Sequence, residues 1–179
     1  MNFKSLSSAF LGMALILQSG IAAAHACDSP LVVSRPPTDP PTYIDNGAPG
    51  SSPGDVRIFH FPGVTQLGQP VITDWIMTTT GVDTAAYGVE SRVATAVFSF
   101  DGFDNDQVVI EGVGLYPDEE SVFTANSTLF RSIICGTGRY KGVSGEVESV
   151  HFADGSWQHI FHFDDGASTK PRKSKRCDD

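Results

Sequence analysis

From Asp55 onward the sequence consists of short segments in which polar and apolar residues alternate, separated by Gly, Pro, Asp and Asn. Alternation with a period of two is typical of β-strands, and no segment keeps the 3.6-residue period of an amphipathic helix. Seven strands are predicted, at residues 55–61, 71–80, 87–100, 107–116, 121–134, 143–153 and 156–164. Turns such as Asp154-Gly155 indicate antiparallel hairpins. The fold is therefore expected to be all-β, either a sandwich or a closed barrel.

A glycine-spaced segment at residues 135–147, CGTGRYKGVSGEV, connects two of these strands. It fits neither glycine-rich loop that holds phosphates. The dinucleotide-binding loop needs its third glycine one residue earlier, and the P-loop needs Ser or Thr where Gly142 follows Lys141. The residues after the segment alternate as in a strand, so no phosphate-binding helix N-terminus is expected. The glycines are predicted to serve backbone geometry at a corner between strands.

The first 26 residues have the features of a secretory signal peptide: Lys4, an apolar stretch at 9–17, and small residues at a cleavage site after Ala26. The apolar stretch is too short to cross a membrane, and no later segment approaches ~18 uninterrupted apolar residues, so no membrane span is expected. The protein is predicted to be secreted, extracellular or, in a bacterium, periplasmic.

The remaining chain is long enough for one domain. Residues 27–54 hold seven of the eleven prolines and are predicted to form an extended, poorly ordered leader before a folded domain at 55–165. Residues 166–179 carry five Lys or Arg and are predicted to be a disordered basic tail. The formal net charge of −9 therefore understates the acidity of the folded part, which argues against nucleic acid as a partner.

The three cysteines allow at most one intramolecular disulfide in an oxidising compartment. A bond between Cys27 and Cys177 is expected, which leaves Cys135 as a small buried residue rather than a nucleophile. Asn126 begins the glycosylation sequon Asn-Ser-Thr. The sequon is a glycosylation site only if the protein comes from a eukaryote, and it falls inside a predicted strand.

Three stretches carry a family resemblance. CGTGRYKGVSGEVE is similar to the signature GGTG-x-[YF]-x-G-[AV]-x-G-x-[VA], with Cys135 in place of its first glycine. Gly54-Asp55-Val56 looks like a strand opening, and residues 98–112 look like an aromatic strand followed by a V-x-G strand. Together they resemble the allene oxide cyclase and dirigent proteins, over roughly residues 54–163.

The resemblance implies a single antiparallel eight-stranded calycin-like barrel, commonly a homotrimer. Its lumen would bind a hydrophobic small molecule and direct its cyclisation or stereochemistry. No organic cofactor or metal is needed, because a reactive precursor closes by itself and the barrel selects one conformer. The glutamate, asparagine and cysteine of the cyclase site have no clear match here, which puts the allene oxide reaction itself in doubt. A non-catalytic, lipocalin-like carrier and an extracellular interaction protein with a filled barrel remain alternatives.

Glu90 and Arg92 share one face of the predicted strand at 87–100 with small and aromatic residues. If this face lines the lumen, the two charges lie at its mouth, where they could orient a carboxylate or activate a proton. In the alternative, they form a solvent-facing pair and the valines of the strand point inward.

Glu111 and Arg131 are each a charge on an otherwise apolar strand face. Buried charges need partners, so the functional interpretation is a Glu111–Arg131 couple in the lumen, and the alternative is exposure at strand ends. Tyr116 corresponds to an aromatic position of the resembled family and could donate a hydrogen bond to a ligand, or could be a plain rim residue.

His159 lies on an aromatic strand face and is the histidine favoured as an acid or base, against the alternative of a core histidine. His162 lies three residues away and points to the opposite face. The two cannot chelate one metal from a regular strand, so no metal site is expected.

Overall fold

The computed structural model describes residues 30–37, 40–101, 106–117 and 122–164, in which every regular element but one short 3-10 helix is a β-strand. The strands are β1 (Leu31–Arg35), β2 (Thr42–Ile44), β3 (Val56–Thr65), β4 (Pro70–Gly81), β5 (Val89–Phe100), β6 (Gln107–Pro117), β7 (Ser127–Gly136), β8 (Gly145–His151) and β9 (Trp157–Phe163), and the 3-10 helix is η1 (Gly138–Tyr140). The prediction of an all-β fold is confirmed.

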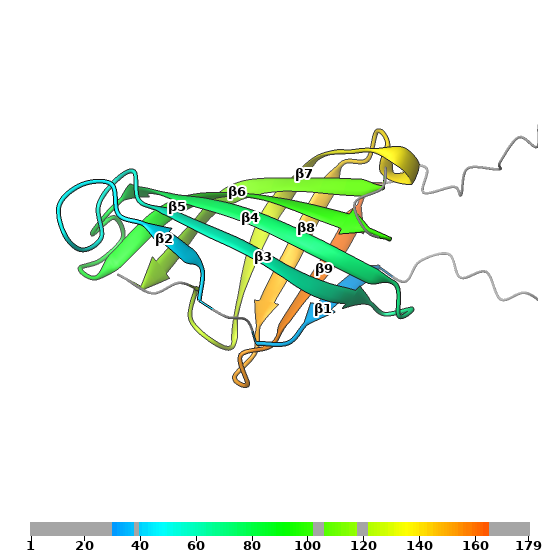
Figure 1. The fold of residues 1–179 in the computed structure, drawn as a ribbon, viewed down its shortest axis with the longest axis horizontal. Helices are drawn as coiled ribbons and strands as arrows, with labels where there is room; N and C mark the ends of the chain where they lie inside the picture. The colour runs from blue at the N-terminus through cyan, green and yellow to red at the C-terminus, as the bar shows by residue number, and fades with distance from the viewer. Residues whose placement is uncertain (1–29, 38–39, 102–105, 118–121, 165–179) are drawn as a thin grey trace, which may run out of the picture.

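The strands form a closed antiparallel barrel (Figure 1). From β3 to β9 each strand pairs with the next one along the chain, and β1 pairs with both β9 and β3 to close the ring. Eight strands make up the wall, and β2 pairs with β3 outside it. The predicted single eight-stranded antiparallel barrel is confirmed, and the sandwich alternative is wrong.

β1 lies in the segment for which the sequence predicts a poorly ordered leader. It pairs with β9 along all five of its residues, and it buries Val33 and Arg35 in the barrel. The expectation of a leader outside the domain is therefore wrong for Leu31–Arg35, and the barrel begins upstream of Asp55. Five residues beside two prolines give too little alternation to predict a strand. Pairing them nevertheless covers strand edges of β9 and β3 that would otherwise stay open.

Asp55 organises the loop between β2 and β3. Its carboxylate accepts hydrogen bonds from the hydroxyl of Tyr43 (2.7 Å), the backbone N–H of Asn46 (2.9 Å), and the backbone N–H and hydroxyl of Ser52 (2.7 and 3.1 Å). Burial by itself raises the pKa of Asp55, but these hydrogen bonds outweigh it and lower the pKa from 3.8 to about 2. The charged form of Asp55 therefore stabilises the folded loop.

We expect this loop to make the protein sensitive to acid. Because the pKa of Asp55 is lower in the folded than in the unfolded chain, its stabilising contribution is complete above about pH 4 and is lost as the pH falls toward 2. Asp55→Ala should lower the free energy of unfolding at pH 7 by about 2 kcal/mol, because four partly buried hydrogen bonds to the carboxylate are lost. Urea unfolding at pH 7 and pH 3 measures both effects. An equal loss from Asp55→Ala at the two pH values would contradict the proposed ionisation.

The glycine-spaced segment forms the corner between β7 and β8, as predicted. η1 lies in this corner, and Tyr140 packs inside the barrel with its ring centroid 4.8 Å from that of Phe100. Gly145 begins β8 with a φ of +137°, in the region that favours glycine. The glycines therefore provide backbone geometry at a barrel corner.

Cys135 is exposed, so its predicted buried position is wrong. Val109 and Ile110 of β6 pair with Cys135 and Ile133 of β7, which leaves Ile134 as an extra residue in a β-bulge. The bulge turns Cys135 to the outer face, against the alternation of the strand. The expected partners of a disulfide, Cys27 and Cys177, lie outside the described residues.

The sequon asparagine precedes β7 instead of lying within a strand. Asn126 is exposed in a turn and has a φ of +57°, and β7 begins only at Ser127. The strand predicted to begin at residue 121 is therefore too long at its start, because a left-handed turn residue interrupts it.

The barrel interior has an apolar half and a polar half. Near the glycine corner it is filled by aromatic and branched side chains, among them Phe98 and Phe161, whose ring centroids are 4.9 Å apart. Toward the opposite end, inward positions of the same strands carry charged and polar side chains. This polar half contains most of the candidate residues predicted from the sequence.

Candidate functional site

The face of β5 that carries Glu90 and Arg92 lines the lumen. Both side chains are fully buried, and the same face continues through Ala94 and Ala96 to Phe98 and Phe100. The valines of β5 are only half-buried and lie on the other face. The functional placement of this pair is thus the correct one, and the solvent-facing alternative is wrong.

Glu90 is enclosed by three donors. It accepts hydrogen bonds from Arg57 (Nη2 to Oε1, 3.1 Å), Thr79 (Oγ1 to Oε2, 2.8 Å) and Arg92. Arg57 also donates to Thr79, at 3.2 Å. We call these four residues the buried ion cluster. The Glu90 carboxylate therefore serves as the counter-ion of two buried guanidinium groups.

Tyr116 links this cluster to Arg131. The guanidinium carbon of Arg92 lies 4.3 Å from the Tyr116 ring centroid, and Nη2 of Arg131 donates to the Tyr116 hydroxyl at 2.6 Å. Tyr116 is fully buried, so its interpretation as a rim aromatic is wrong. Its ring lies over Gly114, where a Cβ would come within 2.9 Å of it. Glycine at that position of β6 therefore makes room for the Tyr116–Arg131 pair.

The predicted Glu111–Arg131 couple does not exist. Arg131 is buried in the lumen, but Glu111 is on the outer face of β6, where it accepts a hydrogen bond from Thr95 at 3.3 Å. The apolar neighbours that suggest a buried face for Glu111, such as Val113, are themselves exposed. The inward face of this part of β6 consists of glycines and Tyr116, which carry little hydropathy signal.

His159 is buried on the inner face of β9. Its Nδ1 lies 3.0 Å from the hydroxyl of Ser149. Burial, and then the positive charges of Arg35 and Arg131, lower the pKa of His159 well below its usual value. The imidazole is therefore neutral near pH 7.

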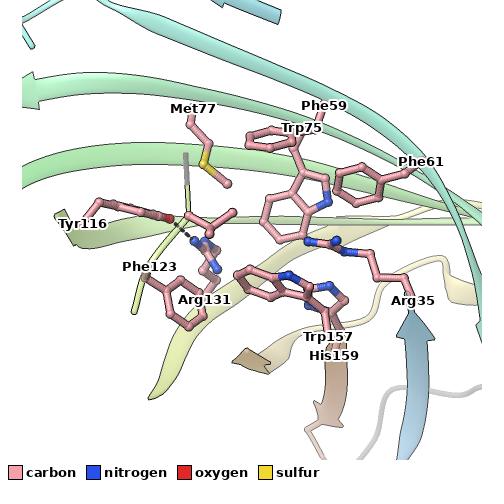
Figure 2. A pocket seen from close by; sticks show the side chains of 11 residues that line it. Arg35, Phe59, Phe61, Trp75, Met77, Tyr116, Phe123, Arg131, Trp157 and His159 are labelled. Atoms are coloured by element: carbon pink, nitrogen blue, oxygen red, sulfur yellow. Dashed lines mark hydrogen bonds between the residues drawn. The ribbon is translucent and has the colours of Figure 1, made fainter. Parts of the chain in front are cut away.

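A cavity in the polar half brings together three of the predicted residues, Tyr116, Arg131 and His159 (Figure 2). Glu90 and Arg92 do not line it. It is lined by Arg35, Phe59, Phe61, Trp75, Met77, Tyr116, Val122, Phe123, Arg131, Trp157 and His159. The volume that the centre of a water molecule can occupy is about 10 Å³. The cavity therefore has room for about one water between these side chains as they stand.

In the walls of the cavity, guanidinium groups lie against aromatic rings. In Figure 2 the guanidinium of Arg35 lies against the rings of Phe61 and Trp157, at 4.0 and 4.6 Å from their centroids. Arg131 lies 5.1 Å from the ring of Trp75. Burial lowers the pKa of Arg35 to about 9, which still leaves it charged at neutral pH.

Three buried nitrogens of the lining residues have no hydrogen-bond partner within the described part of the chain. They are Nε1 of Trp75, Nε of Arg131 and Nε2 of His159. Buried polar atoms are nearly always paired, by protein, water or ligand. The cavity is therefore lined by groups able to bind a polar group.

The sequence predicted Tyr116, Arg131 and His159 in the cavity and Glu90 and Arg92 in the buried ion cluster, but not the other residues of either. Arg57 could have been found, because it shares the inner face of β3 with Phe59 and Phe61. His151 has no distinctive sequence context; it stacks on the cavity residue Trp157 at a centroid distance of 4.3 Å. The sequence around Arg35 does not indicate a strand or a buried position, since Arg35 lies among prolines.

Within the described residues, no group of three or more His, Cys, Asp or Glu is placed to hold a metal ion. No helix in those ranges has the length and apolar character to cross a membrane.

The sequence matches no protein-family model, and it matches none of the curated proteins.

Proposed function

We propose that this protein is secreted and binds an apolar small molecule in the polar half of its barrel, where it directs cyclisation or stereochemistry of that molecule. The supporting observation is the cavity that combines aromatic walls with buried, unpaired polar nitrogens. Ligand sites are typically apolar pockets with a few converging polar groups. In a filled core each such unpaired nitrogen would cost free energy, whereas a bound polar group removes this cost.

The cavity is too small to hold an organic ligand unless side chains move. It has room for about one water, so any larger molecule has to displace lining side chains. Met77 is the unbranched, flexible side chain in the lining and is the easiest to move. The ring walls would then hold the ligand in one conformation, which is the entropic contribution that a cyclase of this kind makes.

In this proposal the charged residues have two different roles. The buried ion cluster keeps the wall in place, whereas Arg131 and Tyr116 face the cavity and can stabilise negative charge that develops on a reacting oxygen. His159 is neutral, so it can donate or accept a single hydrogen bond there. A carrier would use the same groups for binding alone.

The two tryptophans of the chain, Trp75 and Trp157, both line the cavity, so intrinsic fluorescence reports on it directly. We expect epoxy-fatty-acid or phenoxy-radical precursors to change this fluorescence and to give products with an enantiomeric excess. Tight binding with racemic product would favour the lipocalin-like carrier. Neither a fluorescence change nor an enantiomeric excess with any precursor would contradict ligand binding in the lumen. The variant Arg139→Met is changed at the glycine corner, outside the cavity. It should respond to each precursor as the unchanged protein does.

A second candidate is an interaction protein that associates through its outer surface. Large apolar side chains on the outer faces of β4, β6 and β7 are at least half exposed: Ile76, Val113, Leu115, Phe130 and Ile134. Exposed apolar patches mark association sites. A homotrimer of this chain would cover such faces, and light scattering in solution determines its mass.

A further inference from the structure

The polar lining of the cavity is built from hydrogen-bond donors and positive charge. Arginine and the tryptophan indole can only donate, and both Arg131 and Trp75 present such a nitrogen without a partner. Among the described residues that line the cavity, none is an aspartate or a glutamate. A ligand that pairs with these groups must therefore supply a hydrogen-bond acceptor.

Arg131 has no carboxylate partner among the buried residues that the structure describes. The buried carboxylates there are Asp55 and Glu90. Asp55 is engaged in the loop before β3, and Glu90 is shared by Arg57 and Arg92. Arg131, which is 3% exposed, has the neutral hydroxyl of Tyr116 and the ring of Trp75 as its contacts.

His159 lies in the field of two positive charges. Those of Arg35 and Arg131 both act on it, and all three side chains line the same cavity. When the hydroxyl of Ser149 donates to Nδ1, the proton of the neutral ring is on Nε2 and points to the unpaired side. A negative group would be favoured there by the cations and would accept from the neutral donors.

We propose that the cavity bounded by Arg131, Trp75 and His159 holds an anionic group: the carboxylate of the lumen ligand or a free monovalent anion of similar size. The first possibility, a carboxylate that belongs to the lumen ligand, rests on the function proposed above. It would mean that the ligand is an apolar molecule with one negative charge. A free anion as small as chloride or formate needs little more than the space of one water. A carboxylate with a ring or chain attached needs Met77 or its neighbours to move.

A matched set of probes separates these possibilities. Benzoate, benzamide and benzylammonium have nearly the same size and differ in charge, and chloride and formate test the free anion. Each is titrated into the full-length protein at constant ionic strength, with tryptophan fluorescence as the readout. We expect benzoate to bind at least about tenfold more tightly than benzamide, because hydrogen bonds to a charged acceptor are stronger, and benzylammonium not to bind.

Arg131→Met should weaken benzoate about ten- to hundredfold and leave benzamide nearly unchanged. Arg139→Met should change neither. Should Arg131→Met fail to fold, the double variant Arg131→Met/Tyr116→Phe removes both partners of the buried hydrogen bond and carries the same expectation. In addition, the indole N–H resonance of Trp75, assigned by comparison with Trp75→Phe, should shift when benzoate is added.

The outcomes are distinct. Equal affinity for benzoate and benzamide would overturn the anionic site while leaving an apolar lumen ligand in place. Binding of chloride or formate without benzoate would support the anionic site with a free ion as its source. Absence of binding by all five probes would overturn both the anionic site and the proposed lumen function.

Discussion

Glu90→Gln is expected to lower the free energy of unfolding by about 3–5 kcal/mol, because it leaves the guanidinium groups of Arg57 and Arg92 buried without a negative charge. Both arginines are within 2% of full burial, so water cannot replace the lost carboxylate. Their attraction to Glu90 offsets the cost of removing two cations from water. Urea unfolding followed by tryptophan fluorescence measures the loss.

Thr79→Val is the matched control for this experiment. It removes one neutral donor to Glu90 and one acceptor for Arg57 but leaves all three charges, so it should cost only about 1–2 kcal/mol. Replacing Glu90, Arg57 and Arg92 together with Leu, Met and Met should recover much of the stability, since a buried ion cluster and well-packed apolar side chains are of similar stability. If Glu90→Gln costs less than Thr79→Val, the negative charge of Glu90 is not what stabilises this end of the barrel.

Gly145→Ala is expected to be the most damaging single-methyl change in the glycine corner. A Cβ at Gly145 would lie 2.0 Å from the carbonyl oxygen of His162 and 3.0 Å from the Cα of Phe163, both in β9. Because these are backbone atoms paired with β8, the strands would have to separate. The positive φ of +137° adds strain of its own. We expect a loss above about 3 kcal/mol, seen as a lower Tm or as insoluble protein.

Gly142→Ala in the same corner separates the two causes. Gly142 also has a positive φ, of +82°, but a Cβ there would meet no atom within 4 Å. This change should cost roughly 1–2 kcal/mol from backbone conformation alone. Equal losses for the two variants would show that the contact with β9 contributes nothing.

Much of the fold could be predicted from the sequence because strands and turns have local signals. The alternation in β5 placed Glu90, Arg92 and Phe98 on one face, and that face is the buried one. The glycine corner was also recognised correctly as backbone geometry. The strand β1 was missed, because its stability comes from pairing with β9 and β3 rather than from its own five residues.

The candidate site was harder to predict, because alternation shows which residues share a face but not which face is inside. In β6 the apolar face of Val109, Val113 and Leu115 looks like the core, yet it faces outward with Glu111. A bulge at Ile134 likewise reversed the expected side of Cys135. Both errors arise from how the strands pair, which no single segment encodes.

The sequence by itself determined an all-β chain, the approximate strands, and a corner that only glycines can make. Only the tertiary structure decided where the barrel closes, which strand faces meet inside it, and that Arg35, Trp75, Arg131 and His159 share one small cavity. The physical reason is distance along the chain. These four residues come from β1, β4, β7 and β9, and they become neighbours only when ring closure brings opposite walls within reach of one another.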